Sequence, residues 1–275
     1  MDKTVLKIEH ESDDYWTMDM LKSALPLPIP ILDPGDREKM TGLKAPYKPE
    51  PGIEQLRTTR VGDTTQNPFK FVGKLFMTFN GQRYQGSAWV YANRAIASAG
   101  HCIYDKDNGG AASNVIFIPR YDDGAAPIGQ WRVTDAVIYN GWKDNRYFEY
   151  DMSGLIVDRP IAAACGGQLD FEITPQDSPY RSSGYPAESI AGYGFDGKHM
   201  WTSTGSNLAG GNFRKMENNM TGGCSGGPWT ILPREPGSFA SNGLNSFRYQ
   251  DEPNVMYSPV CDAKFKSIHD DVKNS

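Results

Sequence analysis

Residues 220–229 read Met-Thr-Gly-Gly-Cys-Ser-Gly-Gly-Pro-Trp, and this stretch decides how the rest of the sequence is interpreted. Glycines on both sides of Ser225 permit a tight turn and let a carbonyl group approach bare backbone. In such a turn the N–H groups of Gly223 and Ser225 can converge on an oxygen that becomes negative during acyl transfer. Taken alone, the stretch is equally compatible with a glycine-rich structural turn.

Two segments upstream also carry chemistry. Residues 98–102 read Ser-Ala-Gly-His-Cys and end a short apolar run, so the ring of His101 can be presented at the end of a strand. Unperturbed imidazole titrates near ~6.5 and can accept and return a proton at neutral pH. Asp151 opens an otherwise apolar run, a pattern that Asp144 and Asp158 lack, and a buried carboxylate there can fix the tautomer of an imidazole. Alone, each segment is also compatible with a surface histidine or a turn aspartate.

The chain order His101, Asp151, Ser225, with gaps of 50 and 74 residues, is more specific than any one segment. With these residues the sequence resembles the trypsin/chymotrypsin-fold serine peptidases, and most closely the bacterial and fungal branch that includes the glutamyl endopeptidases. Three further segments resemble that branch: Gly184-Tyr185-Pro186, His199-Met200-Trp201 and Gly243-Leu244-Asn245-Ser246-Phe247. The resemblance covers about residues 70–265.

The resemblance implies a role for each motif residue. Ser225 is expected to be the nucleophile, His101 the general base and then acid, and Asp151 the carboxylate that orients it. The backbone amides of Gly223 and Ser225 are expected to form the oxyanion hole. The implied reaction is hydrolysis of peptide bonds in polypeptides through an acyl-enzyme, with no metal and no organic cofactor. An extracellular monomer is expected from the same resemblance.

The chain from residue 69 onward is typical of an all-β protein. Short apolar or alternating runs are separated by turn pairs such as Asn80-Gly81 and Asp123-Gly124. The strands expected in the first half are Phe71–Phe79, Tyr84–Tyr91, Arg94–Ser98, Val115–Pro119, Trp131–Tyr139 and Asp151–Val157. Those in the second half are Ser189–Phe195, Met200–Thr204, Pro228–Leu232, Gly243–Tyr249 and Val255–Val260.

Two such sets predict two packed, chymotrypsin-like antiparallel β-barrels of about six strands each. We expect the first barrel over about residues 69–160 and the second over about 180–262. A C-terminal helix is expected over 262–273, because Asp262 can cap it and apolar residues recur on one face. The residues of that face are Phe265, Ile268 and Val272.

Residues 1–60 differ in texture from the peptidase domain expected over 61–275. Seven of the 19 prolines lie between Pro26 and Pro51 and favour extended or polyproline-like backbone. Before them, residues 16–25 can form one short amphipathic helix. Two interpretations of this Pro-rich leader stay open: a disordered leader, or a pro-segment that lies over the folded part. Arg60-Val61-Gly62 resembles a zymogen cleavage point, where cleavage would remove a cover.

Composition argues against several classes of protein. A net charge of −5 and a pI near 5.4 argue against nucleic acid as the partner. The longest apolar stretch, Ala24–Leu32, is interrupted by three prolines, so no membrane span is expected. The N-terminus is acidic and has no basic flank before an apolar run, so no secretory signal peptide is visible. Secretion is therefore expected from the resemblance alone.

The cysteines leave two questions open. The four cysteines are Cys102, Cys165, Cys224 and Cys261. They are widely spaced and contain no C-x-x-C pair, which argues against a zinc site. The sequence allows either two disulfides or four thiols. Cys224 stands where trypsin-like enzymes carry the aspartate that pairs with a new amino terminus. Read one residue earlier, the motif also resembles viral chymotrypsin-like cysteine peptidases, with Cys224 attacking. The Gly-Gly-Pro that follows is in the register expected for a serine.

Substrate preference is not readable from the sequence. The residues expected to contact substrate are Asn219, Met220, Asn245, Ser246, Phe247 and Arg248. Asn219 stands where trypsin keeps an aspartate, and Asn245 where glutamyl endopeptidases place a histidine. Arg248 near the pocket mouth would favour acidic substrates, and a solvated surface arginine is the alternative. A protease-like binding protein without turnover is the alternative function.

Overall fold

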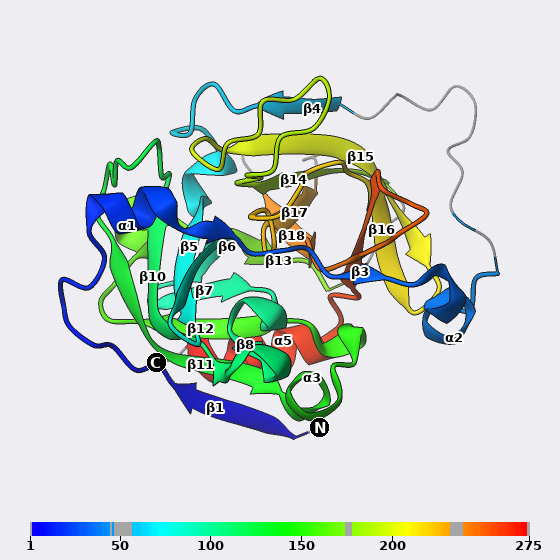
Figure 1. The fold of residues 1–275 in the computed structure, drawn as a ribbon, viewed down its shortest axis with the longest axis horizontal. Helices are drawn as coiled ribbons and strands as arrows, with labels where there is room; N and C mark the ends of the chain where they lie inside the picture. Colours follow the sequence, from blue (N-terminus) through cyan, green and yellow to red (C-terminus); the bar gives the residue numbers. More distant parts are fainter. Residues whose placement is uncertain (1, 45, 47–56, 174–177, 232–238, 274–275) are drawn as a thin grey trace.

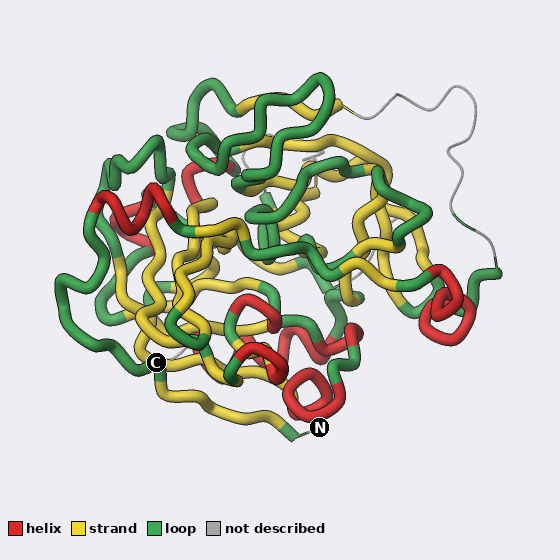
Figure 2. Tube along the Cα trace, viewed as in Figure 1, coloured by secondary structure: helices red, strands yellow, loops and turns green. Residues whose placement is uncertain are grey.

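Strands dominate the fold, and the helices are few and short (Figures 1 and 2). The computed structural model describes residues 2–44, 46, 57–173, 178–231 and 239–273. Most described strands belong to two large sheets, and the N-terminal residues run along their outside. The all-β prediction is therefore confirmed.

The first sheet closes on itself. Its six strands pair antiparallel in the order β10-β5-β6-β7-β12-β11, and β11 then pairs again with β10. Their bounds are β5 (Val72–Phe79), β6 (Gln82–Ala92), β7 (Ala95–Ser98), β10 (Ser113–Pro119), β11 (Trp131–Tyr139) and β12 (Ser153–Val157). β10 pairs with β11 only at Trp131 and Arg132. Further along the same edge, β11 pairs with β1 (Lys3–Lys7) over residues 135–139. The expected first barrel is thus a closed, six-stranded one.

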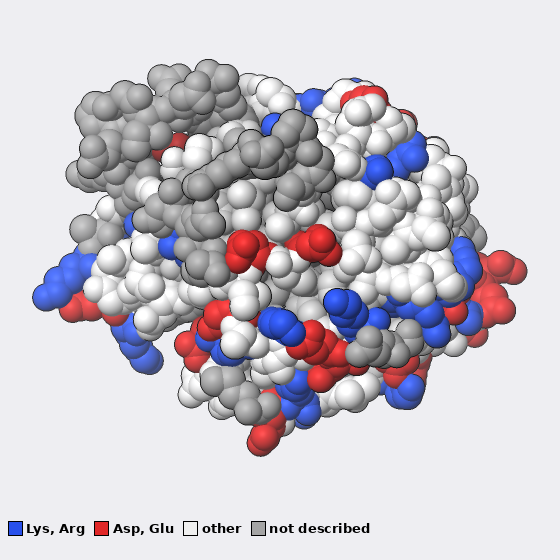
Figure 3. Space-filling model, turned by 180° about the vertical axis from the view of Figure 1, so that it is seen from behind, with Lys and Arg blue, Asp and Glu red and all other residues white. Residues whose placement is uncertain are grey.

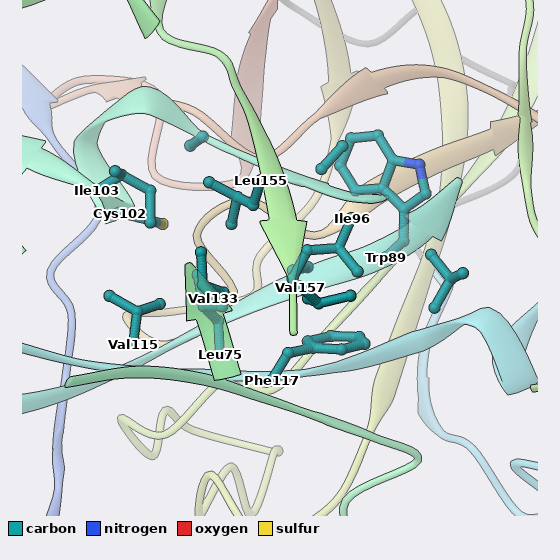
Figure 4. Close-up of a cluster of buried hydrophobic side chains, with 14 of the residues drawn as sticks. Leu75, Trp89, Ile96, Cys102, Ile103, Val115, Phe117, Val133, Leu155 and Val157 are labelled. Carbon is teal, nitrogen blue, oxygen red and sulfur yellow. The ribbon is translucent and has the colours of Figure 1, made fainter. Parts of the chain in front are cut away.

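Alternate residues of these strands fill the barrel. Figure 4 shows side chains from several strands converging on one interior, and all of those named here are fully buried: Leu75, Trp89, Ile96, Val115, Phe117, Val133, Leu155 and Val157. Burial of each large apolar side chain contributes about 1.5–3 kcal/mol. The packed interior holds the strand ends in place. Strand β7 leads into the segment that carries His101, and β12 follows directly after the segment that carries Asp151.

The second sheet has six antiparallel strands in the order β18-β17-β14-β15-β16-β20. Their bounds are β14 (Ser178–Gly184), β15 (Trp201–Gly210), β16 (Phe213–Glu217), β17 (Pro228–Ile231), β18 (Ala240–Leu244) and β20 (Val255–Pro259). Among the described residues, its ends are linked by the Phe247–Tyr257 bridge and not by a ladder. The chain leaves β18 at Leu244 because Asn245 pairs with the turn after Ser225. This sheet is therefore less closed than the expected second barrel.

The strand expected over Ser189–Phe195 is wrong. Only an isolated bridge between Ile190 and Tyr193 forms there, around Gly192 with φ of 84°. That left-handed backbone makes a tight turn and ends any extended run. The alternation of apolar and polar residues in this segment has another cause: Ile190, Tyr193 and Phe195 pack against the core of the second sheet.

The C-terminal helix α5 (Ala263–Lys273) confirms its prediction within one residue. Asp262 accepts the backbone N–H of Lys264 at 2.8 Å, and Phe265, Ile268 and Val272 are buried. The other helices are α1 (Met18–Ser23), α2 (Arg37–Thr41), α3 (Asn140–Asn145) and α4 (Ala162–Cys165). Short 3₁₀ turns are Pro34–Asp36, Phe69–Phe71, Gly100–Cys102, Lys106–Asn108 and Phe148–Tyr150. None of the described helices has both the length and the apolar character needed to cross a bilayer.

The N-terminal residues lie across both sheets (Figure 1). After α1, which falls inside the expected helix, β2 (Leu25–Pro26) pairs with β6. The chain then continues to β3 (Ile31–Leu32), which pairs with β19 (Arg248–Tyr249) beside the second sheet. The remaining strands are β4 (Arg57–Arg60) on β15, β13 (Asp170–Phe171) on β18, and the pair β8 (Tyr104–Asp105) and β9 (Gly110–Ala111).

Charges of both signs are interspersed over the face seen in Figure 3. Many exposed charges are paired, such as Arg146 with Asp107 and Lys266 with Asp270. This mixture agrees with the small net charge of −5.

Candidate active site

His101 lies in the 3₁₀ turn Gly100–Cys102, directly after β7. Its Nδ1 is 2.8 Å from Oδ2 of Asp151, and its backbone N–H donates to Oδ1 of the same carboxylate at 2.7 Å. Glycine leaves room before it, because a Cβ on Gly100 would make tight contacts, 3.0 Å from the ring of Trp142 and 3.2 Å from Asp151 Oδ1. The small residue thus lets ring and carboxylate meet.

Asp151 is fully buried at the start of the segment leading into β12. Besides the two contacts with His101, its Oδ2 accepts a hydrogen bond from the hydroxyl of Ser246. The two competing carboxylates lie elsewhere: Asp158 accepts the backbone N–H of Arg132, and Asp144 pairs with Lys143. Of the three carboxylates considered from the sequence, Asp151 is thus the one that contacts His101.

The carboxylate controls the protonation of the ring. Because Oδ2 of Asp151 accepts from Nδ1, the neutral ring keeps its lone pair on Nε2. Burial alone would lower the pKa of His101, but the adjacent Asp151 carboxylate outweighs it and raises that pKa above its usual value. The arrangement can accept a proton at Nε2 and stabilise the resulting imidazolium.

Ser225 lies in a tight turn between β16 and β17. The turn is held by Cys224 N–H donating to Thr221 O and by Gly227 N–H donating to Cys224 O. Gly226 has φ of 79°, and a Cβ there would lie 2.1 Å from Ser98 Oγ and 2.9 Å from Ala99 N. The turn therefore packs against the end of β7, just before His101.

Two side-chain atoms at this junction have no hydrogen-bond partner among the described residues. They are Nε2 of His101 and Oγ of Ser225, and both are buried. Buried polar atoms are normally paired, and those left unpaired in a structure are often functional. Proton transfer between a hydroxyl and an imidazole would involve these two atoms.

Gly223 has φ of 93°, and its backbone N–H donates to the carbonyl oxygen of Leu27 at 2.9 Å. A side chain is excluded here, because a Cβ would lie 2.5 Å from the oxygen of Tyr185. The N–H expected at the oxyanion hole is thus aimed outward at a carbonyl oxygen that belongs to the N-terminal segment. Sequence reasoning gave no sign of this contact.

Cys224 points away from this junction into the second sheet. It is fully buried in a cluster with Met220 and Trp229, and burial raises its thiol pKa to about 12. A thiolate is the reactive form of cysteine, so this environment disfavours Cys224 as a nucleophile. The four cysteines are all buried and free, which answers the disulfide question in favour of thiols.

Three of the other residues expected to contact substrate make internal contacts instead. Asn245 is structural: its Oδ1 accepts from Ser182, Asn218 and Trp229, and its Nδ2 donates to Cys224 O. Phe247 packs in an aromatic cluster and Asn219 accepts from Thr58. Asn219 therefore supplies no negative charge of the kind that trypsin has at this position, and Asn245 supplies no imidazole of the kind that glutamyl endopeptidases have.

Arg248 is not a solvated surface residue. It is buried, and its guanidinium donates to the carbonyl oxygens of Met220 and Pro253. Its Nε has no partner within the described part of the chain. A buried cation thus lies beside the segment that precedes Ser225. Glu188, which sequence reasoning missed, accepts the N–H of Gly222 nearby.

Among the described residues, no cluster of histidine, cysteine, aspartate or glutamate has the geometry to hold a metal ion. The candidate site brings together an imidazole, a carboxylate, a hydroxyl and backbone N–H groups. Together these groups can carry out acyl transfer to a serine hydroxyl.

The fold is that of the chymotrypsin-like class. No family model matches the sequence. A search of curated proteins finds glutamyl endopeptidase of Bacillus licheniformis, 27% identical over 158 residues, covering 56% of this chain and 48% of the relative. It also finds an extracellular metalloprotease of Bacillus subtilis, 22% identical over 175 residues, covering 62% and 53%. The chain therefore spans about half the length of these curated relatives.

Solved structures agree along nearly their whole length. Thermostable serine protease AL20 from an extremophilic microorganism matches with a TM-score of 0.67 and 28% identity, over 75% of this chain and 98% of the other. Protease Anisep of Arthrobacter nicotinovorans matches with 0.67 and 28%, over 76% and 98%. A Glu endopeptidase matches in fold with 0.65 and 20%, over 79% and 97%. These comparisons confirm the predicted resemblance to chymotrypsin-like serine peptidases of the glutamyl endopeptidase branch.

Proposed function

We propose that the chain is a serine endopeptidase that hydrolyses polypeptides through a His101-Asp151-Ser225 triad. The observation that carries the proposal is the buried carboxylate of Asp151, which contacts both Nδ1 and the backbone N–H of His101. The packing of the Ser225 turn against the strand end before His101 supports the same assignment. The similarity to serine proteases AL20 and Anisep supports the reaction class.

In the proposed reaction, Nε2 of His101 takes the proton of Ser225 as Oγ attacks the substrate carbonyl carbon. The carbonyl electrons move to oxygen, where the N–H groups of Gly223 and Ser225 stabilise the negative charge. The imidazolium, stabilised by Asp151, then protonates the leaving amine as the C–N bond breaks. Water hydrolyses the acyl-enzyme by the same proton transfers in reverse, with no metal or organic cofactor.

Arg248 is the residue we assign to substrate preference. A cation buried beside Met220 favours an acidic side chain entering from solvent, because low-dielectric surroundings strengthen the attraction. Asn219 and Asn245 carry no charge, whereas the nearby Glu188 carboxylate attracts Arg248 and offsets part of this preference. Polypeptides with acidic residues are thus the proposed substrates of an extracellular monomer without nucleic-acid partners. Residues 1–60 are proposed as a pro-segment and 61–275 as the peptidase domain.

Digestion of fluorescent casein tests this function, with the intact chain and after limited proteolysis. Hydrolysis that disappears in Ser225→Ala is the expected result, since only residual catalysis from binding and oxyanion donors would remain. A folded protein without hydrolysis in either state would instead favour the protease-like binding protein. Hydrolysis that survives Ser225→Ala and disappears in Cys224→Ala would favour the cysteine peptidase.

A further inference from the structure

Residues 24–32, called the strap here, run from β6 of the first sheet to β19 beside the second sheet (Figure 1). Between these ends, the carbonyl oxygen of Leu27 lies on Gly223 of the candidate site. At one end β2 pairs in parallel with β6, with Leu25 opposite Tyr84 and Pro26 opposite Gln85. At the other end β3 pairs in parallel with β19. An extended segment that adds a strand to exposed edges is a common way of binding a peptide. Here the bound peptide is part of the same chain.

The strap uses the backbone groups that a substrate would need. The N–H of Gly223 donates to the oxygen of Leu27 at 2.9 Å, so the proposed oxyanion donor already has an acceptor. The N–H of Leu27 donates to Gln85 O at 2.9 Å, and the N–H of Arg248 donates to Pro30 O at 3.0 Å. A substrate carbonyl can reach Gly223 only if the strap leaves.

The side chains of Leu27 and Ile29 anchor the strap, because both are buried in the hydrophobic clusters below it. Leu27 is 6% exposed and belongs to the core of the first barrel, whereas Ile29 is 7% exposed and belongs to the cluster that contains Met220 and Cys224. Ile31 in the same strap is 64% exposed. The strap is therefore fixed on both sides of the Ser225 turn, and Ile31 offers a matched control.

The peptide bond that the strap presents is a poor one to cleave. The carbonyl on Gly223 belongs to Leu27, so the leaving nitrogen would be that of Pro28. Pro28 and Pro30 line a cavity of about 220 Å³ together with His101, so the strap's prolines border the same cavity as the imidazole. Prolines at 26, 28 and 30 also fix an extended backbone in advance and so lower the entropy lost on binding.

We propose that the strap inhibits the peptidase in cis, occupying the oxyanion donor and the substrate edges without being cut. This inference rests on the proposed function, since it assigns regulation to the same site. Tethering to the peptidase makes occupation intramolecular, so a modest affinity is enough to block the site. Activation would then require displacement or removal of the N-terminal segment.

Ile29→Ser tests the proposal and Ile31→Ser is its control. Loss of the buried Ile29 anchor is expected to raise casein hydrolysis and the rate of labelling by a fluorophosphonate about 10- to 100-fold. Ile31→Ser is expected to stay at the rate of the unmodified chain. Leu27→Ser removes the second anchor and is expected to match Ile29→Ser, and thermal unfolding checks that all three are folded.

Three outcomes are informative. Acceleration in the anchor variants alone supports the proposal. Equal and rapid hydrolysis by the unmodified chain and all variants overturns inhibition but leaves the peptidase standing. Absence of hydrolysis and labelling in every folded variant overturns the proposed function, and inhibition with it.

A measurement on the unmodified chain does not depend on any variant. After brief labelling, mass spectrometry separates chains that retain residues 1–44 from shorter ones. Adducts concentrated on the shorter chains support the strap as inhibitor. Adducts formed equally fast on intact chains overturn it.

Discussion

Asp151 is the residue on which the proposed chemistry depends most. It is fully buried, and it accepts from Nδ1 of His101 and from the hydroxyl of Ser246. An amide at this position would present an N–H to Nδ1 and favour the wrong tautomer. We therefore expect Asp151→Asn, placed in the Ile29→Ser chain, to lower kcat by ~10⁴ while the fold is retained. Steady-state hydrolysis of a peptide ester measures this, and a loss below tenfold would contradict the role given to Asp151.

The pH dependence of activity follows from the same pair. Burial acts to lower the pKa of His101, but the Asp151 carboxylate outweighs it, so the pKa is raised. His101 must be neutral to act as general base, so activity is expected to rise as pH increases through its pKa. The acid limb of kcat/KM should therefore lie above the usual imidazole value of ~6.5 and move down in Asp151→Asn. A limb below the usual value in the parent chain would contradict this assignment.

Among the elements, the C-terminal helix packs partly through a set of aromatic contacts. Phe265 of α5 is fully buried, stacks on Trp89 at 6.3 Å between ring centroids, and meets Phe171 edge-on at 4.7 Å. Phe265→Ala is expected to lower the free energy of unfolding by about 3–5 kcal/mol. Lys266 is the next residue and its side chain is about half exposed, so Lys266→Ala should lower the free energy of unfolding far less. Urea unfolding of both variants measures the difference, and equal losses would show that α5 is not packed this way.

Elements with strong local patterns could be predicted from sequence. The strand expected over Trp131–Tyr139 has the same bounds as β11, and α5 begins one residue after its expected start. In both, side-chain periodicity and burial select the same conformation. The expected Ser189–Phe195 strand failed because Gly192 adopts a left-handed conformation that alternation does not reveal.

Contacts between distant elements could not be predicted in this way. The motif residues identified which imidazole and carboxylate meet, because each lies at a strand end with a distinctive sequence. Nothing local showed that Asn245 would hold the Ser225 turn, or that Leu27 would meet Gly223. These contacts join residues far apart in the chain, so they depend on how the two sheets pack.

For the whole molecule, the central point is that the site is shared. The first barrel supplies His101 and Asp151, and the second sheet supplies the Ser225 turn and Ser246. The N-terminal segment pairs with strands on both sides and covers the junction. Under the proposed function, the packing of the two sheets and the release of the strap would therefore set how much of the site a substrate can reach.

The most direct test of the central claim is the position of a serine-directed adduct. The Ile29→Ser chain is treated with a fluorophosphonate and digested, and the modified residue is located by tandem mass spectrometry. We predict modification of Ser225, unchanged in Cys224→Ala and lost in His101→Ala. An adduct on another residue, or equally fast labelling of Ser225 without His101, would contradict the proposed catalytic site.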